Sequence, residues 1–346
     1  MVAQRSLPAP RTPDPMAAPA VRWGILAPGW IAQQFAAALR RGTRQEIVAV
    51  GSRNLDRARA FADDCGASTA YGSYQELLGD PRVDVVYVAS PHSEHHRQAR
   101  LALEAGKPVL VEKAFTRNAA EARELVDLAR SKGMFLMEGM WSRFLPHYDV
   151  IDQAVRGGLI GEVTTVFADH GQRLHPGGPE RLSSPDLAGG ALLDLGIYPV
   201  SFADFALGPF TSITATGTVT DLGVDSQECV TVTSGTGALG VLHASMLAGS
   251  SCTASICGTE GRLDVDGRFY FPTRVRLHDR DGEEIDRFDP VGDVAHQGLR
   301  FQAAEVARCL TAGATESRRL PLDTTVRIMS ALDAVRAQLG VRYPGE

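Results

Sequence analysis

The sequence has few cysteines, no excess of basic residues and no long apolar run. Its five cysteines are widely spaced, without a C-x-x-C motif or paired Cys/His spacing, so we expect reduced thiols in a cytoplasmic protein and no metal site. The formal net charge is −6, which leaves no basic field to attract nucleic acid. The strongest apolar stretch, residues 83–89, is far shorter than a membrane span. We therefore expect a soluble protein with a small-molecule or protein partner.

The length of 346 residues suggests about two domains, preceded by a tail. Residues 1–20 contain five prolines and few large apolar side chains, so they predict a disordered segment. No apolar core of a secretory signal follows the N-terminus. The sequence leaves open whether translation starts at Met1 or at Met16.

Short apolar runs alternate with helical patterns between residues 21 and 140. The helices include residues 55–65, residues 94–105 and a helix with Asn118 as its predicted N-cap, followed three residues later by Glu121. Strands that are apolar on both faces and separated by helices predict a doubly wound parallel sheet of the α/β class. The predicted strands of this domain are residues 22–27, 46–52, 83–90, 107–112 and 134–137.

Strand patterns dominate the rest of the chain, residues 141–346. A helix beginning at Pro146 ends at Gly157-Gly158, and two helices close the chain, the last with Asp323 as its predicted cap and Gly340 as its end. This order predicts a second α/β domain with a large, mostly antiparallel open sheet, and its terminal helix could pack back on the first domain. The predicted strands are residues 162–169, 212–220, 228–234, 239–246, 254–258 and 274–278.

The turn after the first strand matches the dinucleotide fingerprint G-x-G-x-x-G/A, with Ala27 in the first glycine position. Such a turn lets the backbone and the positive helix end approach a pyrophosphate, although an ordinary strand-to-helix turn would use the same residues. We expect cofactor contacts from Ala27, Pro28, Gly29, Trp30 and Ile31.

The end of the second strand carries Ser52 and Arg53 where an acidic residue would bind the ribose of NAD. An arginine favours the 2′-phosphate of NADP(H), with Arg57 as a second cation one turn later. Arg53 could instead be a solvated loop residue, and use of NAD(H) stays open.

Three further stretches carry a specific resemblance: SPHSEH at residues 90–95, GKPVLVEK at residues 106–113 and GGALLDLGIY at residues 189–198. Together with the turn, with MEGMWSRF at residues 137–144 and with LGVRYP at residues 339–344, they resemble the Gfo/Idh/MocA oxidoreductases, in particular the branch of dihydrodiol and NADP-dependent D-xylose dehydrogenases. The resemblance implies an N-terminal Rossmann domain, a C-terminal sheet domain and association through that sheet as a homodimer or homotetramer. Ala27 and Ala114 depart from the family's glycine and proline.

The resemblance also implies the site. Tyr198 is the candidate base, Lys113 the cation that stabilises its phenolate, and Asp194 a group that orients Lys113 or the substrate; a structural role for Asp194 stays open. Trp141 and Arg143 would line the substrate pocket with Tyr198, against the alternative of a core Trp and a surface Arg. His95 would support the nicotinamide side or be purely structural. Residues 171–185 would shape specificity. The further expected cofactor contacts are Ser90, Pro91, His92, His95, Glu112 and Lys113.

These features predict an enzyme that transfers hydride between NADP(H) and a CH-OH group of a sugar or a trans-dihydrodiol. An alternative is a reductase of a dicarbonyl sugar such as 1,5-anhydrofructose. Alternatives of another class are a nicotinamide-dependent glycosidase and a non-catalytic NADPH sensor.

Overall fold

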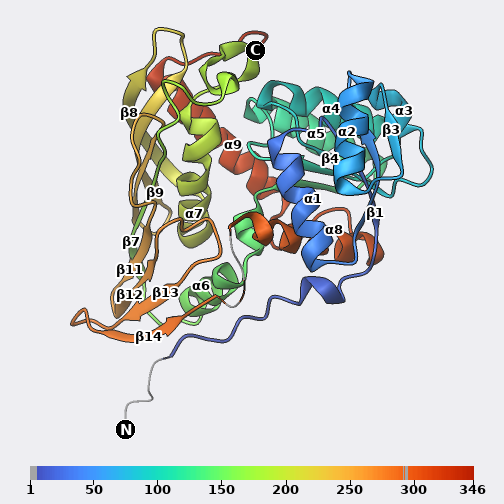
Figure 1. Cartoon of the computed structure of the whole chain (residues 1–346). Coiled ribbons are helices and arrows are strands. Elements are labelled where there is room, and N and C mark those ends of the chain that lie inside the picture. The colour runs from blue at the N-terminus through green and yellow to red at the C-terminus, as the bar shows by residue number, and fades with distance from the viewer. Residues whose placement is uncertain (1–5, 291, 293–294) are drawn as a thin grey trace. The chain divides into compact units, whose positions relative to one another are not determined.

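The computed structural model describes residues 6–290, 292 and 295–346, which fall into two compact units. The parallel-sheet unit comprises Pro13–Phe144 and Val294–Met329. The antiparallel-sheet unit comprises Met1–Thr12, Leu145–Asp293 and Ser330–Glu346. Figure 1 labels the elements of both.

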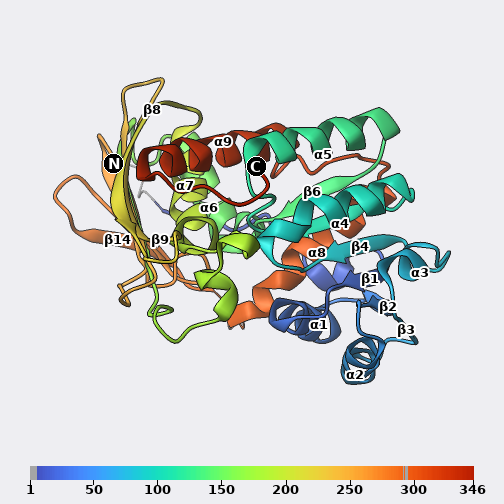
Figure 2. The ribbon, with the colours of Figure 1, turned by 90° about the horizontal axis from the view of Figure 1, so that it is seen from above.

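The parallel-sheet unit contains the predicted doubly wound sheet. Its six strands run in the order β3-β2-β1-β4-β5-β6, and every neighbouring pair is parallel. The chain reverses its winding direction between β1 and β4, which is where open α/β sheets bind ligands. Figure 2 shows α1 and α2 on one face of these strands, with α4 and α5 on the other. The elements are β1 (Arg22–Leu26), α1 (Trp30–Gly42), β2 (Glu46–Gly51), α2 (Leu55–Cys65), β3 (Thr69–Tyr71), α3 (Tyr74–Leu78), β4 (Val85–Val88), α4 (His92–Glu104), β5 (Val109–Glu112), α5 (Ala119–Lys132), β6 (Leu136–Gly139) and α8 (Leu299–Thr311).

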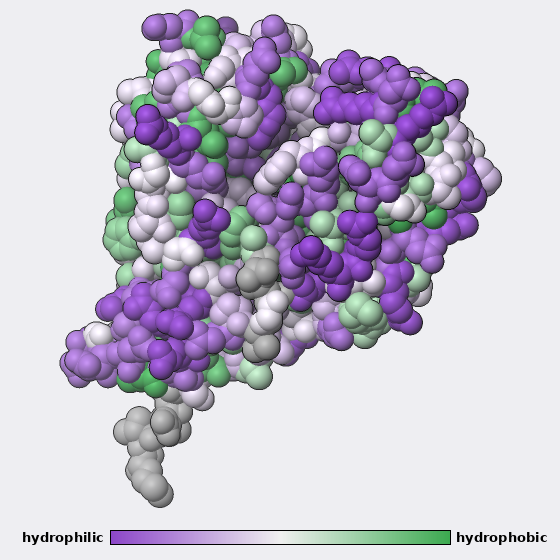
Figure 3. All heavy atoms as spheres, viewed as in Figure 1, coloured by the Kyte–Doolittle hydropathy of each residue, from purple (hydrophilic) through white to green (hydrophobic). Residues whose placement is uncertain are grey.

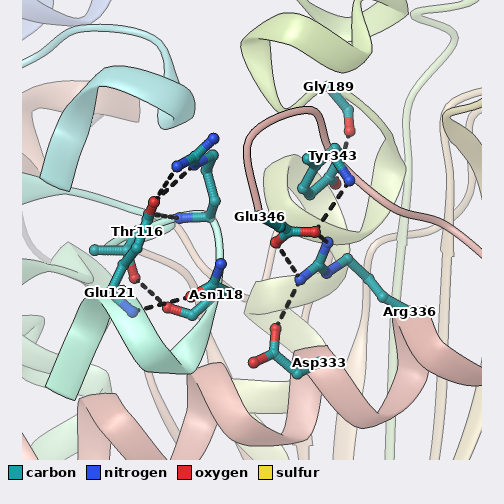
Figure 4. A network of polar contacts seen from close by, with 9 residues as sticks. Thr116, Asn118, Glu121, Gly189, Asp333, Arg336, Tyr343 and Glu346 are labelled. Carbon is teal, nitrogen blue, oxygen red and sulfur yellow. Dashed lines mark hydrogen bonds and ion pairs between the residues drawn. The ribbon is translucent and has the colours of Figure 1, made fainter. Parts of the chain in front are cut away.

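Local sequence signals set several ends of these elements. The side chain of Asn118 accepts a hydrogen bond from Glu121 N at 2.9 Å, so the predicted cap of α5 is confirmed (Figure 4). Gly133 ends the same helix in the left-handed conformation, with φ of 62°. Helix α6 (Pro146–Arg156) in the other unit begins at the predicted proline.

The boundary of the first domain differs from the predicted one. Residues of α8 group with the parallel-sheet unit, where α8 packs against α1 and buries Leu299 and Val306. Helix α9 (Leu322–Leu339) belongs to this unit as far as Met329. This grouping of α9 agrees with the possibility that the terminal helix packs back on the first domain. The return of α8 was not predicted, because the pattern of an amphipathic helix shows which of its faces is buried but not which sheet covers that face.

The tail is ordered where the structure describes it, in contrast to the predicted disorder of residues 1–20. Arg308 donates a hydrogen bond to Asp14 O at 2.7 Å, and Ala18 is fully buried. Earlier in the segment, the Arg11 side chain pairs with Asp149 at 3.1 Å. The prediction of disorder considered only the apolar side chains within residues 1–20. The observed contacts are made with residues elsewhere in the chain, which the composition of the tail does not show. The remaining part of the predicted segment, residues 1–5, lies outside the described residues.

The antiparallel-sheet unit is built on eight strands in the order β14-β13-β12-β11-β7-β10-β9-β8. Only the pair β7 and β10 is parallel, which confirms the mostly antiparallel sheet. Helix α7 (Ile197–Leu207) packs on β7 and β10. The strands are β7 (Val163–Gly171), β8 (Phe210–Val219), β9 (Asp225–Ser234), β10 (Leu239–Ser245), β11 (Ala254–Gly258), β12 (Gly261–Val265), β13 (Val275–His278) and β14 (Glu284–Phe288).

The two faces of this sheet differ in their covering. On the covered face the rings of Tyr148, Phe202 and Phe269 pack in sequence, with centroids 5.8 and 5.3 Å apart. On the opposite face Phe167 is 46% exposed, and its register partner Val241 is 38% exposed. Hydrophobic side chains line this margin of the sheet in the space-filling view (Figure 3). This face is therefore available for packing against another surface.

The described residues contain one stretch long and apolar enough to cross a membrane, Pro185–Leu207, with a mean hydropathy of 1.3. This stretch of 23 residues is longer than residues 83–89, so the sequence analysis was wrong to take residues 83–89 as the strongest apolar stretch. In the structure 83% of its most apolar window is buried, because it includes α7 on the sheet. The stretch has the burial of a core helix.

Candidate active site

The turn between β1 and α1 has the geometry of an anion-binding site. Ala27 adopts φ of 61°, the conformation that a glycine usually occupies here, and its N–H donates to Gly51 O at 3.1 Å. Gly29 is the N-cap of α1, and no side chain caps this helix. A Cβ built on Gly29 would meet nothing nearer than Ala27 O and Ala89 O, both at 3.9 Å. The fold itself therefore leaves open space and free helix N–H groups beside this turn.

Two exposed arginines follow β2, Arg53 before α2 and Arg57 within it. Asn54 caps α2 by accepting from Arg57 N at 3.0 Å, and Asn54 N donates to Ser52 Oγ at 3.2 Å. The guanidinium groups of Arg53 and Arg57 are exposed, and no carboxylate among the described residues pairs with either. A phosphate group would find both cations free.

His95 connects two loops at the carboxyl edge of the parallel sheet. It is fully buried, and its ring nitrogens lie 2.8 Å from Ser90 O and 2.8 Å from Ala114 O. Burial lowers the pKa of this imidazole. Ala114 is itself fully buried and follows a cis peptide bond with Lys113. His95 thus supports the turn after Lys113, which is the structural alternative for this residue, and Ala114 is held in place without the family's proline.

The buried side chain of Glu112 supports the backbone of Lys113. Its carboxylate accepts from Tyr87 Oη at 2.5 Å and from Lys113 N at 3.1 Å, and only 4% of the residue is exposed. Glu112 ends β5, so Lys113 emerges at the carboxyl edge where Ala27 and Ser90 also lie. His92, the first residue of α4, is buried and packs edge-on against His95.

An aromatic cluster that the sequence did not predict lies in the same unit. His296 packs edge-on against Trp30, with centroids 4.9 Å apart, and parallel to Trp141 at 6.1 Å. Trp30 is 61% exposed, whereas Trp141 and Arg143 are buried. The burial of Arg143 excludes the alternative of a surface arginine. A single histidine in a polar segment gave no signal for the position of His296.

Asp194 and Tyr198 lie in the antiparallel-sheet unit, on a turn that widens before α7. Leu192–Gly196 forms a π-helical turn, and Tyr198 is the second residue of α7. The four-residue spacing therefore runs through a π turn and not through a regular α-helix. Such turns are rare and occur mostly at functional sites.

Tyr198 is packed in an aromatic group that the sequence also did not predict. The ring of Tyr198 lies 4.6 Å from that of Tyr270 and 5.3 Å from that of His170, and these two partners are 4.1 Å apart. Gln172 donates to Tyr270 Oη at 3.3 Å. Tyr198 is 7% exposed, so its ring is held in a defined orientation.

The loop at residues 171–185, which was expected to shape specificity, contributes a charged partner to Asp194. Arg181 Nη2 lies 3.1 Å from Asp194 Oδ1, and the two side chains are 39% and 11% exposed. A mostly buried carboxylate is thus neutralised by a partly exposed guanidinium. Neither composition nor spacing identified Arg181.

The candidate residues gather in two places. Those expected to hold the cofactor, with Trp141 and Arg143, belong to the parallel-sheet unit, and Asp194 and Tyr198 belong to the other unit. The approach of Lys113 to Tyr198 stays a prediction. Within the described ranges no group of three or more His, Cys, Asp or Glu side chains could hold a metal ion.

Comparison with known proteins agrees with this architecture. Residues 21–140 match the oxidoreductase family with an NAD-binding Rossmann fold, and residues 148–264 match the GFO/IDH/MocA C-terminal domain. The chain is 36% identical to the trans-1,2-dihydrobenzene-1,2-diol dehydrogenase of Macaca fuscata fuscata, covering 94% of this chain and 98% of that one. It is also 36% identical to the D-xylose 1-dehydrogenase (NADP(+)) of Hypocrea jecorina, covering 94% and 93%.

Solved structures give the same assignment. A 3-ketoreductase from Actinomadura kijaniata, crystallised with NADP and TDP-benzene, superposes with a TM-score of 0.81 at 28% identity, covering 92% of this chain and 98% of that one. A levoglucosan dehydrogenase shares the fold, with a TM-score of 0.83 at 18% identity, over 95% of this chain and 100% of that one. The chain belongs to the Gfo/Idh/MocA family and is an NAD(P)-dependent oxidoreductase.

Proposed function

We propose that this enzyme transfers hydride between NADP(H) and a CH-OH carbon of a sugar or a trans-dihydrodiol. The observation that carries the choice of NADP(H) is the end of β2, where Arg53 and Arg57 are exposed cations without a carboxylate partner among the described residues. An acidic side chain at this position would repel a 2′-phosphate, and none is present. Relatives named as NADP-dependent xylose dehydrogenase and as dihydrodiol dehydrogenase support this substrate class.

The residues present fit a bound dinucleotide. The open space at Gly29 and the uncapped end of α1 would hold the pyrophosphate, while Arg53 would hold the 2′-phosphate. Ser90 and Pro91 follow β4 at the switch point of the sheet, beside the turn that contains Ala27. The bound nicotinamide supplies the hydride chemistry.

The chain's own residues would handle the proton. In oxidation the phenolate of Tyr198 takes the hydroxyl proton of the substrate as the carbon loses its hydride, and Tyr198 becomes a neutral phenol. The ammonium of Lys113 stabilises the phenolate before this transfer, and Asp194 orients Lys113 or a second substrate hydroxyl. In the reverse direction Tyr198 Oη returns the proton to the new alkoxide. Trp141 and Arg143 would complete the wall of the substrate pocket.

The direct test follows nicotinamide absorbance with NADP or NAD and a panel of aldoses, trans-diols and inositols, for wild type and Tyr198→Phe. We expect turnover with NADP that falls by about 100-fold or more in the variant, while NADP binding is unchanged. Equal turnover of the variant would remove Tyr198 from its role.

The same assay separates the alternatives. Activity seen only with NADPH and a dicarbonyl sugar would favour the reductase. This combination is included in the assay because a 3-ketoreductase is among the similar structures. Hydrolysis of a glycoside with dinucleotide retained but not consumed would indicate a glycosidase. Firm NADPH binding without any turnover would indicate a sensor.

The exposed face of the eight-stranded sheet supports a homodimer or homotetramer. Phe167 and Val241 pair in register at its centre, and Leu239 on β10 is 49% exposed. Light scattering coupled to size exclusion measures the assembly. We expect Val241→Asp to shift the protein toward monomer, and an unchanged mass would exclude this face as the interface.

A further inference from the structure

Two carboxyl groups lie buried beneath the turn that carries Asp194. Asp225, the first residue of β9, is fully buried, and Glu228 on the same strand is 2% exposed. Their burial raises the pKa of Asp225 to about 6 and that of Glu228 well above its usual value. Buried ionisable groups cost stability compared with apolar side chains, so their presence here needs an explanation.

Asp225 is bonded to the start of the π turn. Its Oδ2 accepts the N–H of Leu192 at 2.5 Å, and its Oδ1 has no hydrogen-bond partner in the described structure. The N–H of Leu192 opens the π turn, where a helical segment provides no acceptor of its own. A charged acceptor makes this a stronger bond than a neutral one would.

Glu228 touches the end of the same turn. A Cβ on Gly196 would lie 2.5 Å from Glu228 Oε1, so only glycine lets the turn approach this carboxyl so closely. Gly190, before the turn, has the same relation to Asp225, because its Cβ would lie 2.2 Å from Oδ1. Glu228 also lines a cavity with Gly196 and Pro199, whose volume of about 10 Å³ is no more than one water molecule needs.

The C-terminal segment holds Gly189, which lies shortly before the π turn. Tyr343 donates to Gly189 O at 2.9 Å, and Tyr343 N donates to Glu346 Oε2 at 3.0 Å (Figure 4). Arg336 pairs with Glu346 at 2.8 Å and with Asp333 at 3.0 Å. Gly189, which precedes the turn, is therefore held by Tyr343, while Asp225 and Glu228 contact the turn at its start and at its end.

We propose that Asp225 and Glu228 are positioning residues, which hold the π turn so that Asp194 and Tyr198 face the substrate. They act through their contacts with Leu192 and Gly196. This inference rests on the proposed roles of Asp194 and Tyr198. The same arrangement explains Gly190 before the turn and Gly196 at its end.

The test combines kinetics with hydrogen exchange on the full-length protein. Asp225→Asn keeps the size of the side chain but weakens the acceptor and buries an unpaired donor. We expect kcat to fall roughly 10- to 100-fold, the Kd for NADP to stay within about twofold of wild type, and amide exchange of residues 192–196 to become faster. The matched control is Asp169→Asn, since Asp169 also accepts backbone N–H groups, from Cys252 and Thr253, both at 3.1 Å. We expect it to leave kcat and the exchange of the turn unchanged.

A second variant separates positioning from stability. Glu228→Leu removes a buried carboxyl, so we expect a higher Tm. Its branched methyl groups cannot lie flat against Gly196 as a carboxyl does, so we expect a lower kcat together with the higher Tm. A merely structural role would leave kcat at the wild-type value.

The outcomes are distinguishable from those of the proposed function. If Tyr198→Phe is inactive but both variants keep wild-type kcat and exchange, the positioning role is wrong and the function stands. If Tyr198→Phe is fully active, the role proposed for Tyr198 is wrong and the positioning role is overturned with it, whereas the hydride transfer itself stands.

Discussion

Arg181 holds the carboxylate of Asp194 from the loop that precedes the π turn, with 3.1 Å between Nη2 and Oδ1. The guanidinium is partly exposed while the carboxylate is nearly buried, so the pair joins the solvent-facing loop to the interior of the site. Asp194 was expected to orient Lys113 or the substrate. The structure adds a partner from its own unit that fixes the carboxylate before either arrives.

Replacing Arg181 should therefore impair catalysis through Asp194. Arg181→Ala removes a charged hydrogen-bond donor from a mostly buried carboxylate, which costs about 1–3 kcal/mol. We expect kcat/KM to fall by about 10- to 100-fold with the Kd for NADP unchanged, measured by steady-state kinetics and by titration of nucleotide fluorescence. Arg173→Ala is the matched control, because Arg173 is an exposed arginine of the same loop that forms no ion pair with any described residue. Equal losses in both variants would contradict a specific role for the pair.

The exposed cation after β2 should decide cofactor choice. Arg53→Asp removes a phosphate partner and adds a repelling charge, so we expect kcat/KM for NADP to fall at least 10-fold relative to that for NAD. Initial rates with both nucleotides measure the ratio. The control is Arg59→Asp, which makes the same charge change within α2, where Arg59 lies 3.5 Å from Asp56. This variant should leave the ratio unaltered. An unchanged ratio in Arg53→Asp would leave Arg53 as a solvated loop residue.

A side chain at Gly29 should weaken nucleotide binding without lowering the stability of the fold. Gly29→Ala meets no atom nearer than 3.9 Å, and its φ of −109° suits any residue. We expect the free energy of unfolding to change by less than about 1 kcal/mol, while the Kd for NADP rises at least 10-fold because the methyl group occupies phosphate space. Gly24→Ala is the opposite case, since its Cβ would lie 2.9 Å from Leu77 and Val83 side chains. It should lower Tm; nucleotide binding unaffected by Gly29→Ala would refute the phosphate-turn role.

Much of the parallel sheet was predictable because β4, β5 and β6 are buried on both faces, and because α2 and α5 begin at asparagine caps. β3 was not predicted, since its three residues are only partly buried and show no alternation. Asp323 was predicted as a cap but lies inside α9, which begins at Leu322. The N–H of Leu322 donates to Glu316 Oε2 at 2.7 Å, an acceptor six residues away that the usual cap position does not include.

The site was predictable only where one motif carries the chemistry. The stretch containing Asp194 and Tyr198 is continuous, so the resemblance found it. His170 and Tyr270 are 100 residues apart and meet because β7 and the segment after β12 converge on Tyr198. The π turn at Leu192–Gly196 has an apolar composition like that of an α-helix, so its sequence did not distinguish the two.

A buried carboxyl in the parallel-sheet unit should make stability depend on pH. Glu138 is 1% exposed, its Oε2 accepts from Thr325 at 3.0 Å and its Oε1 has no partner in the described structure. Burial raises its pKa from 4.5 to about 7. Between these values the folded state binds a proton that the unfolded state does not, so the free energy of unfolding should fall as pH rises from about 4.5 to about 7. Glu138→Gln keeps the shape of the protonated side chain and cannot ionise, so its urea midpoint relative to wild type should be higher at pH 7.5 than at pH 5. The same difference at both pH values would show that Glu138 does not titrate in this range.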